Sequence, residues 1–144
     1  MRGAEAPERA TRVTQVSTPP PASTVLRRAA LAATGGAVGT AARLGLGMLI
    51  TGAPSAVLTV NIVGALLLGV LTARLPSGDL RILLGTGLLG GFTTYSAFAV
   101  DGVELWEASP LLAVGYIAVS LAGGLLAAWL GLRLGGALGR RSAS

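Results

Sequence analysis

The chain has 144 residues, of which 52% are hydrophobic and 12% are charged, with a formal net charge of +5. Its mean hydropathy of +0.72 is too high for an ordinary soluble domain. Neither cysteine nor histidine occurs. Thiol chemistry, histidine-based acid–base catalysis and the usual zinc sites are therefore excluded.

The first 24 residues differ in character from the rest of the chain. They end in TQVSTPPPAST, are rich in Thr, Pro, Ser and Ala, and show no apolar periodicity. We expect a disordered cytoplasmic tail over 1–24, because such a segment cannot bury enough surface to fold. No apolar core follows a basic start within it, so it does not read as a signal peptide.

Apolar stretches of about 20 residues follow, each long enough to span a bilayer as a helix. They predict an all-α, four-helix transmembrane domain over 25–139, followed by a cytoplasmic tail over 140–144. The expected helices cover about 29–50, 55–75, 81–105 and 108–133. A soluble bundle would need polar outer faces, which these stretches lack.

Every basic residue of the chain is an arginine, and their placement predicts an orientation. With four spans, one side of the membrane carries Arg2, Arg9, Arg12, Arg27, Arg28, Arg74, Arg81, Arg133, Arg140 and Arg141. The other side has no loop arginine, and we expect the loop after the third helix to hold Asp101, Glu104 and Glu107. Arginine-rich loops stay in the cytoplasm, so both termini are predicted to be cytoplasmic. The charge is a topology signal, and no nucleic-acid partner is expected.

The first helix carries Gly35, Gly39, Arg43 and Gly47 at four-residue intervals, which places them on one face. For the glycines this spacing favours close helix packing. Arg43 is costly inside a membrane. Two interpretations stay open for it: snorkelling to the interface, or attracting an anion in a water-filled vestibule.

The second helix contains one carboxamide, Asn61, in an otherwise apolar run. Its amide either makes an interhelical hydrogen bond or donates to a passing anion. Gly64, three residues on, allows close approach on the same face.

The third helix holds the run GLLGGFTTYSAFAVD. Gly90-Gly91 followed by Thr93-Thr94 is a poor helix centre, and we expect a break there. Freed carbonyl oxygens suit a hard cation; the alternative is a tight crossing with an unbroken backbone. Tyr95 and Phe98 share a face, and their ring edges are positive enough to favour an anion, although ordinary packing would explain the same spacing.

The fourth helix presents Tyr116, Ser120 and Gly124 as a weakly polar stripe. The Ser120 hydroxyl either bonds the carbonyl four residues earlier or lines a pore.

Three of these motifs together resemble the CrcB/Fluc family of fluoride channels. They are Gly35-Gly36-x-x-Gly39-x-x-x-Arg43, Val60-Asn61-x-x-Gly64-x-x-x-x-Gly69, and the run from Gly90 to Phe98, which is close to the family's GGFTTFSTF. The resemblance covers about Gly35 to Gly131.

The resemblance implies passive fluoride export through an antiparallel, dual-topology-type dimer of four-helix subunits in a bacterial plasma membrane. It implies a structural sodium ion held by the carbonyls of Gly90 and Thr93 in the broken third helices. It places Arg43 and Asp101 in the vestibule. The implied fluoride pathway comprises Asn61, Thr94, Tyr95, Ser96, Phe98 and Ser120. Tyr95 and Ala97 stand where the family pattern has Phe and Thr.

The arginine bias bears on the identity of the dimer partner. One sequence that inserts both ways needs a weak charge bias, so we expect an oppositely oriented paralogue, with a homodimer as the alternative. This chain would then be a weakly conducting or non-conducting partner subunit. A small multidrug transporter needs a membrane-embedded carboxylate, and no Asp or Glu lies inside the apolar stretches 29–50, 55–73, 82–100 and 108–132. A scaffold role leaves Asn61 and the GGFTTYS run without a purpose, and no catalytic constellation predicts an enzyme.

Overall fold

The structure is a computed structural model that describes residues 20–50 and 52–141. It contains α1 (Ala22–Leu49), α2 (Ala53–Arg74), α3 (Asp79–Arg81), the π-helix η1 (Ile82–Leu89), α4 (Gly90–Phe92), α5 (Tyr95–Ala108) and α6 (Pro110–Arg141). Most of the expected N-terminal tail, residues 1–19, and residues 142–144 lie outside the described part. Residues 22–24, expected in that tail, form the first turn of α1.

Within the described residues, three helical segments are long and apolar enough to cross a membrane: Pro54–Arg74, Asp79–Ala108 and Pro110–Gly139. The chain is therefore an all-α protein of the membrane type. Helix α1 has 28 residues and is about 42 Å long. It is not among the three, because its glycines, threonines and Arg43 dilute its apolar content.

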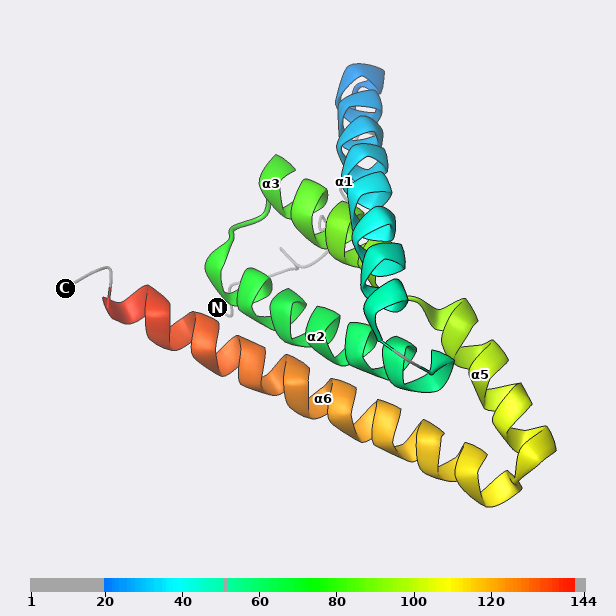
Figure 1. Ribbon diagram of the computed structural model, residues 1–144. Coiled ribbons are helices and arrows are strands. Elements are labelled where there is room, and N and C mark those ends of the chain that lie inside the picture. Colours follow the sequence, from blue (N-terminus) through cyan, green and yellow to red (C-terminus); the bar gives the residue numbers. More distant parts are fainter. Residues whose placement is uncertain (1–19, 51, 142–144) are drawn as a thin grey trace, which may run out of the picture.

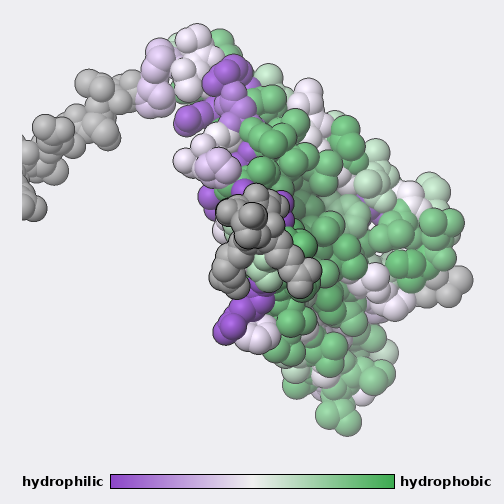
Figure 2. All heavy atoms as spheres, turned by 90° about the vertical axis from the view of Figure 1, so that its left-hand side faces the viewer, coloured by the Kyte–Doolittle hydropathy of each residue, from purple (hydrophilic) through white to green (hydrophobic). Residues whose placement is uncertain are grey.

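The helices form two parallel pairs (Figure 1). Helices α2 and α6 run side by side in the same direction, and α1 packs along η1 and α4. Helix α5 diverges from α4 and turns back into α6. Large apolar side chains such as Met48 and Leu111 stay exposed on the single chain. Figure 2 shows apolar residues over most of the visible face, with hydrophilic ones gathered along one edge.

Glycines allow the helix backbones of both pairs to pack closely against each other. A Cβ added at Gly69 of α2 would lie 3.0 Å from the Cα of Gly131 on α6. A Cβ added at Gly131 would likewise lie 3.0 Å from the Cα of Gly69. A Cβ at Gly35 of α1 would lie 3.0 Å from the Cα of Gly87 in η1. Small residues that allow backbones to touch are the usual basis of helix association in membranes.

We expect Gly69→Ala to lower the stability of the folded chain by about 1–3 kcal/mol, the usual cost of overpacking. The added methyl group would collide with the Ala128 carbonyl of α6. Gly136→Ala on α6 is the matched control, because a Cβ there meets nothing within 4 Å. Thermal unfolding in detergent measures both. Equal melting temperatures for the two variants would contradict this account of the α2–α6 contact.

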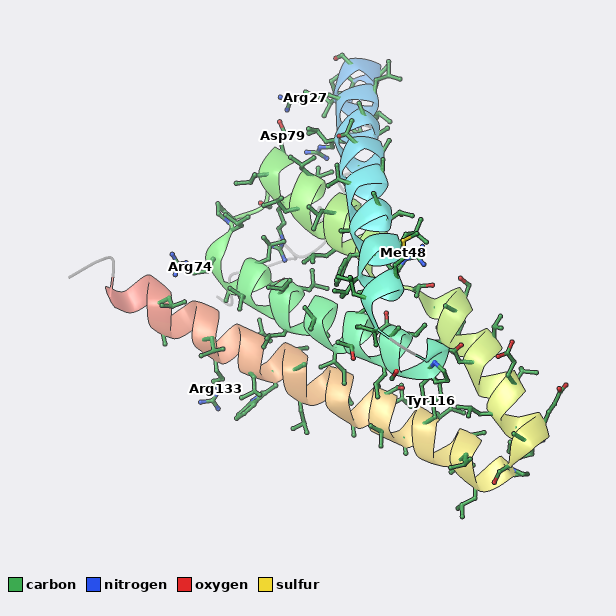
Figure 3. All side chains as sticks on the ribbon, viewed as in Figure 1. Arg27, Met48, Arg74, Asp79, Tyr116 and Arg133 are labelled. Atoms are coloured by element: carbon green, nitrogen blue, oxygen red, sulfur yellow. The ribbon has the colours of Figure 1, made fainter. Side chains whose placement is uncertain are left out.

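An ion pair joins the ends of two helices away from these seams. An Arg27 guanidinium nitrogen of α1 lies 2.8 Å from a carboxylate oxygen of Asp79 at the start of α3, as Figure 3 shows. Both side chains are exposed, so the pair contributes at most about 1 kcal/mol.

The expected loop after the third helix is wrong. Helix α5 continues through Ala108, so Asp101, Glu104 and Glu107 are helical, and Ser109 alone separates α5 from α6. The helix ends where it does because Ser109 precedes Pro110 and adopts an extended backbone. Asp101, expected beyond the third span, is buried within the helical segment Asp79–Ala108.

Candidate functional site

The helical path is interrupted at Thr93 and Thr94. Helix α4 ends at Phe92, both threonines adopt an extended backbone (φ −81°, ψ 156° and φ −145°, ψ 120°), and α5 begins at Tyr95. The Thr93 hydroxyl donates to the Leu89 carbonyl at 2.9 Å. The Thr94 hydroxyl accepts from the Ala97 N–H at 3.3 Å, which makes Thr94 the N-cap of α5. The adjacent threonines thus end one helix and start the next.

Asn61 of α2 bonds the interruption at two points. Its Nδ2 donates to the Thr94 carbonyl at 3.0 Å, and its Oδ1 accepts from the Thr94 N–H at 2.8 Å. The carboxamide therefore satisfies both backbone polar groups of a non-helical residue, as a membrane interior requires. Of the alternatives open for Asn61, the interhelical hydrogen bond is present. A carboxamide has a second N–H, which this pairing does not use.

The carbonyls of α4 have different fates. In a continuous helix the Thr94 N–H would bond the Gly90 carbonyl, but here it bonds Asn61. Across the described residues, no hydrogen bond reaches the carbonyl of Gly90 or Thr93. The Gly91 carbonyl accepts from the Thr40 hydroxyl at 3.3 Å and from Arg43 Nε at 3.4 Å. The two carbonyls expected to bind a cation thus accept no hydrogen bond within the described residues.

A groove of about 410 Å³ lies beside the interruption. It brings together most of the residues selected from the sequence, although they come from four helices. The residues that line it are Asn61, Gly64, Ala65, Leu68, Gly85, Leu89, Gly90, Thr93, Thr94, Tyr95, Phe98, Ser120 and Leu121. Ser96 lies next to it, with its hydroxyl 3.2 Å from that of Thr94.

Three aromatic rings form a row between α5 and α6. The Tyr95 and Phe98 centroids are 5.9 Å apart with the rings tilted by 44°, and those of Phe98 and Tyr116 are 5.4 Å apart at 30°. The Tyr116 hydroxyl donates to Asp101 Oδ2 at 3.2 Å, and Tyr116 lies where α6 faces α5 (Figure 3). Tyr95 is 81% exposed on the single chain, so the row starts at the surface.

The Ser120 hydroxyl is buried and, within the described part of the chain, has no hydrogen-bond partner. The bond to the carbonyl four residues earlier, one of the two alternatives open for it, is therefore not made. Buried unpaired polar groups are uncommon in native proteins. Because Ser120 also lines the groove, a small polar ligand there would supply the missing partner.

The two residues expected in a vestibule lie apart from the groove. Arg43 lines a second cavity of about 270 Å³ between α1 and α2, together with Met48 and Thr94. Thr94 lines both hollows and so lies between them. Asp101 is 5% exposed and is held between α5 and α6 by its bond with Tyr116.

Across residues 20–50 and 52–141, no group of three or more Asp, Glu, His or Cys side chains could hold a metal ion. Backbone carbonyl oxygens, which suit hard cations, are among the donors present at the interruption.

An all-α chain with three membrane-capable helices belongs to the class of multi-pass membrane proteins. Residues 30–132 match the family model described as CrcB-like protein, Camphor Resistance (CrcB), and the chain belongs to this family.

Similar proteins carry a functional name. The chain is 44% identical over 108 residues to the fluoride-specific ion channel FluC 2 of Rhodococcus jostii, a match that covers 72% of this chain and 95% of that protein. It is 45% identical over 111 residues to the fluoride-specific ion channel FluC of Paracoccus denitrificans (72% and 90% covered). It is 42% identical over 124 residues to that of Thermus thermophilus (78% and 98% covered).

Proposed function

We propose that this chain is a subunit of a fluoride-specific ion channel that exports fluoride passively across the bacterial plasma membrane and so lowers its toxicity in the cytoplasm. The observation that carries the proposal is the groove. It gathers Asn61, Tyr95, Phe98 and Ser120 beside a helix interruption, in a chain whose relatives are named for fluoride conduction.

The chemistry of the groove suits a small anion that must pass without being trapped. Asn61 offers its second N–H and Ser120 an unpaired hydroxyl. The aromatic row offers positive ring edges. No arginine lines the groove, so no charged side chain there would bind the anion too tightly to release. Passive flow has a physiological reason, because hydrogen fluoride enters as a neutral acid and dissociates inside, leaving an anion that needs a path out.

A second subunit is part of this proposal. Tyr95 is mostly exposed and the groove that it lines is open on the single chain, so we infer that a partner closes the pathway. The Gly90 and Thr93 carbonyls fit a structural sodium ion, which would hold the interruption in shape. Two carbonyls from one chain are few for a hard cation, which takes six or more oxygen ligands. An antiparallel dimer would supply four, and water or other oxygens the rest.

The proposed membrane topology has four spans and both termini in the cytoplasm. Helix α1 is the first span, and Asp79–Ala108 is one span broken at Thr93 and Thr94. In support, the C-terminal ends of α2 and α6 and the start of α3 lie on the same side of the molecule, opposite the α5–α6 turn (Figure 1). The elements on that side carry Arg74 at the end of α2, Arg81 at the end of α3 and Arg133 in the last third of α6. Helix α5, which leads to the opposite side, holds three of the chain's six acidic residues.

The deciding experiment is fluoride efflux from liposomes, followed with a fluoride electrode. Because the arginine bias favours pairing with an oppositely oriented paralogue, we expect slow efflux from the full-length chain alone. We expect faster efflux when a second family member from the same genome is reconstituted with it. Protein-free liposomes are the control.

Each result of this experiment has a defined meaning. Fast efflux from this chain alone would show that no paralogue is needed and would favour a homodimer. The proposed channel function would stand. Absence of fluoride efflux from both preparations would overturn the channel function itself.

A further inference from the structure

Two side chains of α1 bond the same backbone carbonyl of the interruption. The Gly91 carbonyl accepts from Thr40 Oγ1 at 3.3 Å and from Arg43 Nε at 3.4 Å. We propose that Thr40 and Arg43 are positioning residues of the cation site. They occupy the Gly91 carbonyl and fix the end of α4, so that the carbonyls of Gly90 and Thr93 are the ones that face the ion. This inference rests on the proposed sodium site.

The donors reach Gly91 because one face of α1 lies against α4. Gly36, Thr40 and Arg43 are spaced i, i+4 and i+7, which places them on one helix face. A Cβ added at Gly91 would lie 2.9 Å from the Cα of Gly36. This glycine pair brings the backbones together, and the next two turns of α1 then present a hydroxyl and a guanidinium to the end of α4.

Two of the competing carbonyls near the interruption, those of Leu89 and Gly91, are engaged. The Leu89 carbonyl accepts from both the N–H and the hydroxyl of Thr93, and the Gly91 carbonyl is engaged from α1. The last carbonyls of a helix carry partial negative charge and attract cations and donors. Without Thr40 and Arg43, the Gly91 carbonyl would be free to turn toward the ion, and the Gly90 carbonyl would lose its fixed direction.

The two donors differ in strength. Charge-assisted hydrogen bonds are about twice as strong as neutral ones, so Arg43 holds Gly91 more firmly than Thr40 does. Both side chains are half-buried, and both bonds cross from α1 to α4. Thr34, two turns earlier on α1, instead bonds the Ala30 and Leu31 carbonyls of its own helix. Thr34 is therefore a matched control.

The test is the sodium dependence of thermal unfolding of the purified full-length protein in detergent, with N-methylglucamine replacing sodium. We expect the sodium concentration for half-maximal stabilisation to rise about fivefold in Thr40→Val and about tenfold in Arg43→Met. Thr40→Ser keeps the hydroxyl and should restore the wild-type value. Thr34→Val should leave it unchanged. If Thr40→Val does not fold, Thr40→Ala and Arg43→Met carry the same test.

The outcomes separate positioning from packing. Variants that melt at lower temperature by the same amount at every sodium concentration, with an unchanged sodium midpoint, would show a packing role and overturn the inference. A wild-type protein whose unfolding does not respond to sodium would overturn both the sodium site and this inference. Fluoride efflux from liposomes is measured separately, so the channel function can stand while the inference fails.

Discussion

We expect Asn61→Asp to lower fluoride efflux about a thousandfold. An ionised aspartate is an acceptor only, so the Thr94 carbonyl loses the donor that now lies 3.0 Å away. The variant also places a negative charge beside the proposed anion path. At about 4 Å and an effective dielectric constant of about 20, two like charges repel by about 4 kcal/mol. Each 1.36 kcal/mol of barrier is a factor of ten in rate.

The control for this variant lies two residues earlier on α2. Thr59 is exposed, and its hydroxyl donates to the Ser55 carbonyl of its own helix at 2.8 Å. Thr59→Val should conduct like the wild type. Gel filtration and helix content establish that both variants are folded. A folded Asn61→Asp protein that releases fluoride at the wild-type rate would remove Asn61 from the pathway.

At the interruption, the local sequence predicts the weak point of the helix but not the residue that stabilises it. Two glycines followed by two threonines indicate a weak helix between Gly90 and Thr94, because these residues disfavour helix for local reasons. The extended residues are Thr93 and Thr94. What stabilises them there is Asn61, 33 positions away from Thr94. A partner at that distance is a property of the tertiary structure, so the sequence left the hydrogen bond and the anion contact as equal alternatives.

Two features of the site were missed for the same reason. A threonine within a membrane helix usually bonds a carbonyl of its own helix, as Thr34 does. The bond from Thr40 to α4 depends on how α1 packs against α4, which the sequence does not indicate. The π-helix η1 was also not expected. Its only signal is the pair Gly85 and Gly87, and Gly87 contacts the backbone of α1. π-helical turns often occur at functional sites.

The burial of Asp101 changes the argument against a small multidrug transporter. The carboxylate of Asp101 does lie within the membrane-capable segment Asp79–Ala108. Proton-coupled exchange can therefore no longer be excluded on the ground that the spans lack a carboxylate. The family match and the names of the relatives now carry that decision. Asp101 bonds the Tyr116 hydroxyl and so helps to hold the ring that stacks on Phe98.

The second large effect is expected for a substitution in the row of aromatic rings. We expect Phe98→Leu to lower fluoride efflux about thirtyfold, because leucine fills similar space without a polarised ring edge. A cation over a ring face gains about 2 kcal/mol in a desolvated site. We take the same magnitude for an anion at the ring edge, and 1.36 kcal/mol is a factor of ten in rate. Phe98 is the middle ring, stacked at 5.4 Å on Tyr116 and 5.9 Å from Tyr95, so its loss also frees both neighbours.

Two conservative variants separate the ring edge from the packing around it. Phe98→Tyr keeps the ring and should retain most of the flux. Tyr95→Phe removes only a hydroxyl at the exposed end of the row, and it should conduct at least as well as the wild type if that hydroxyl narrows the path. Efflux from liposomes at equal protein content measures all three. If Phe98→Leu and Phe98→Tyr conduct equally, the ring only fills space between α5 and α6, and the proposed contact between its edge and the anion is wrong.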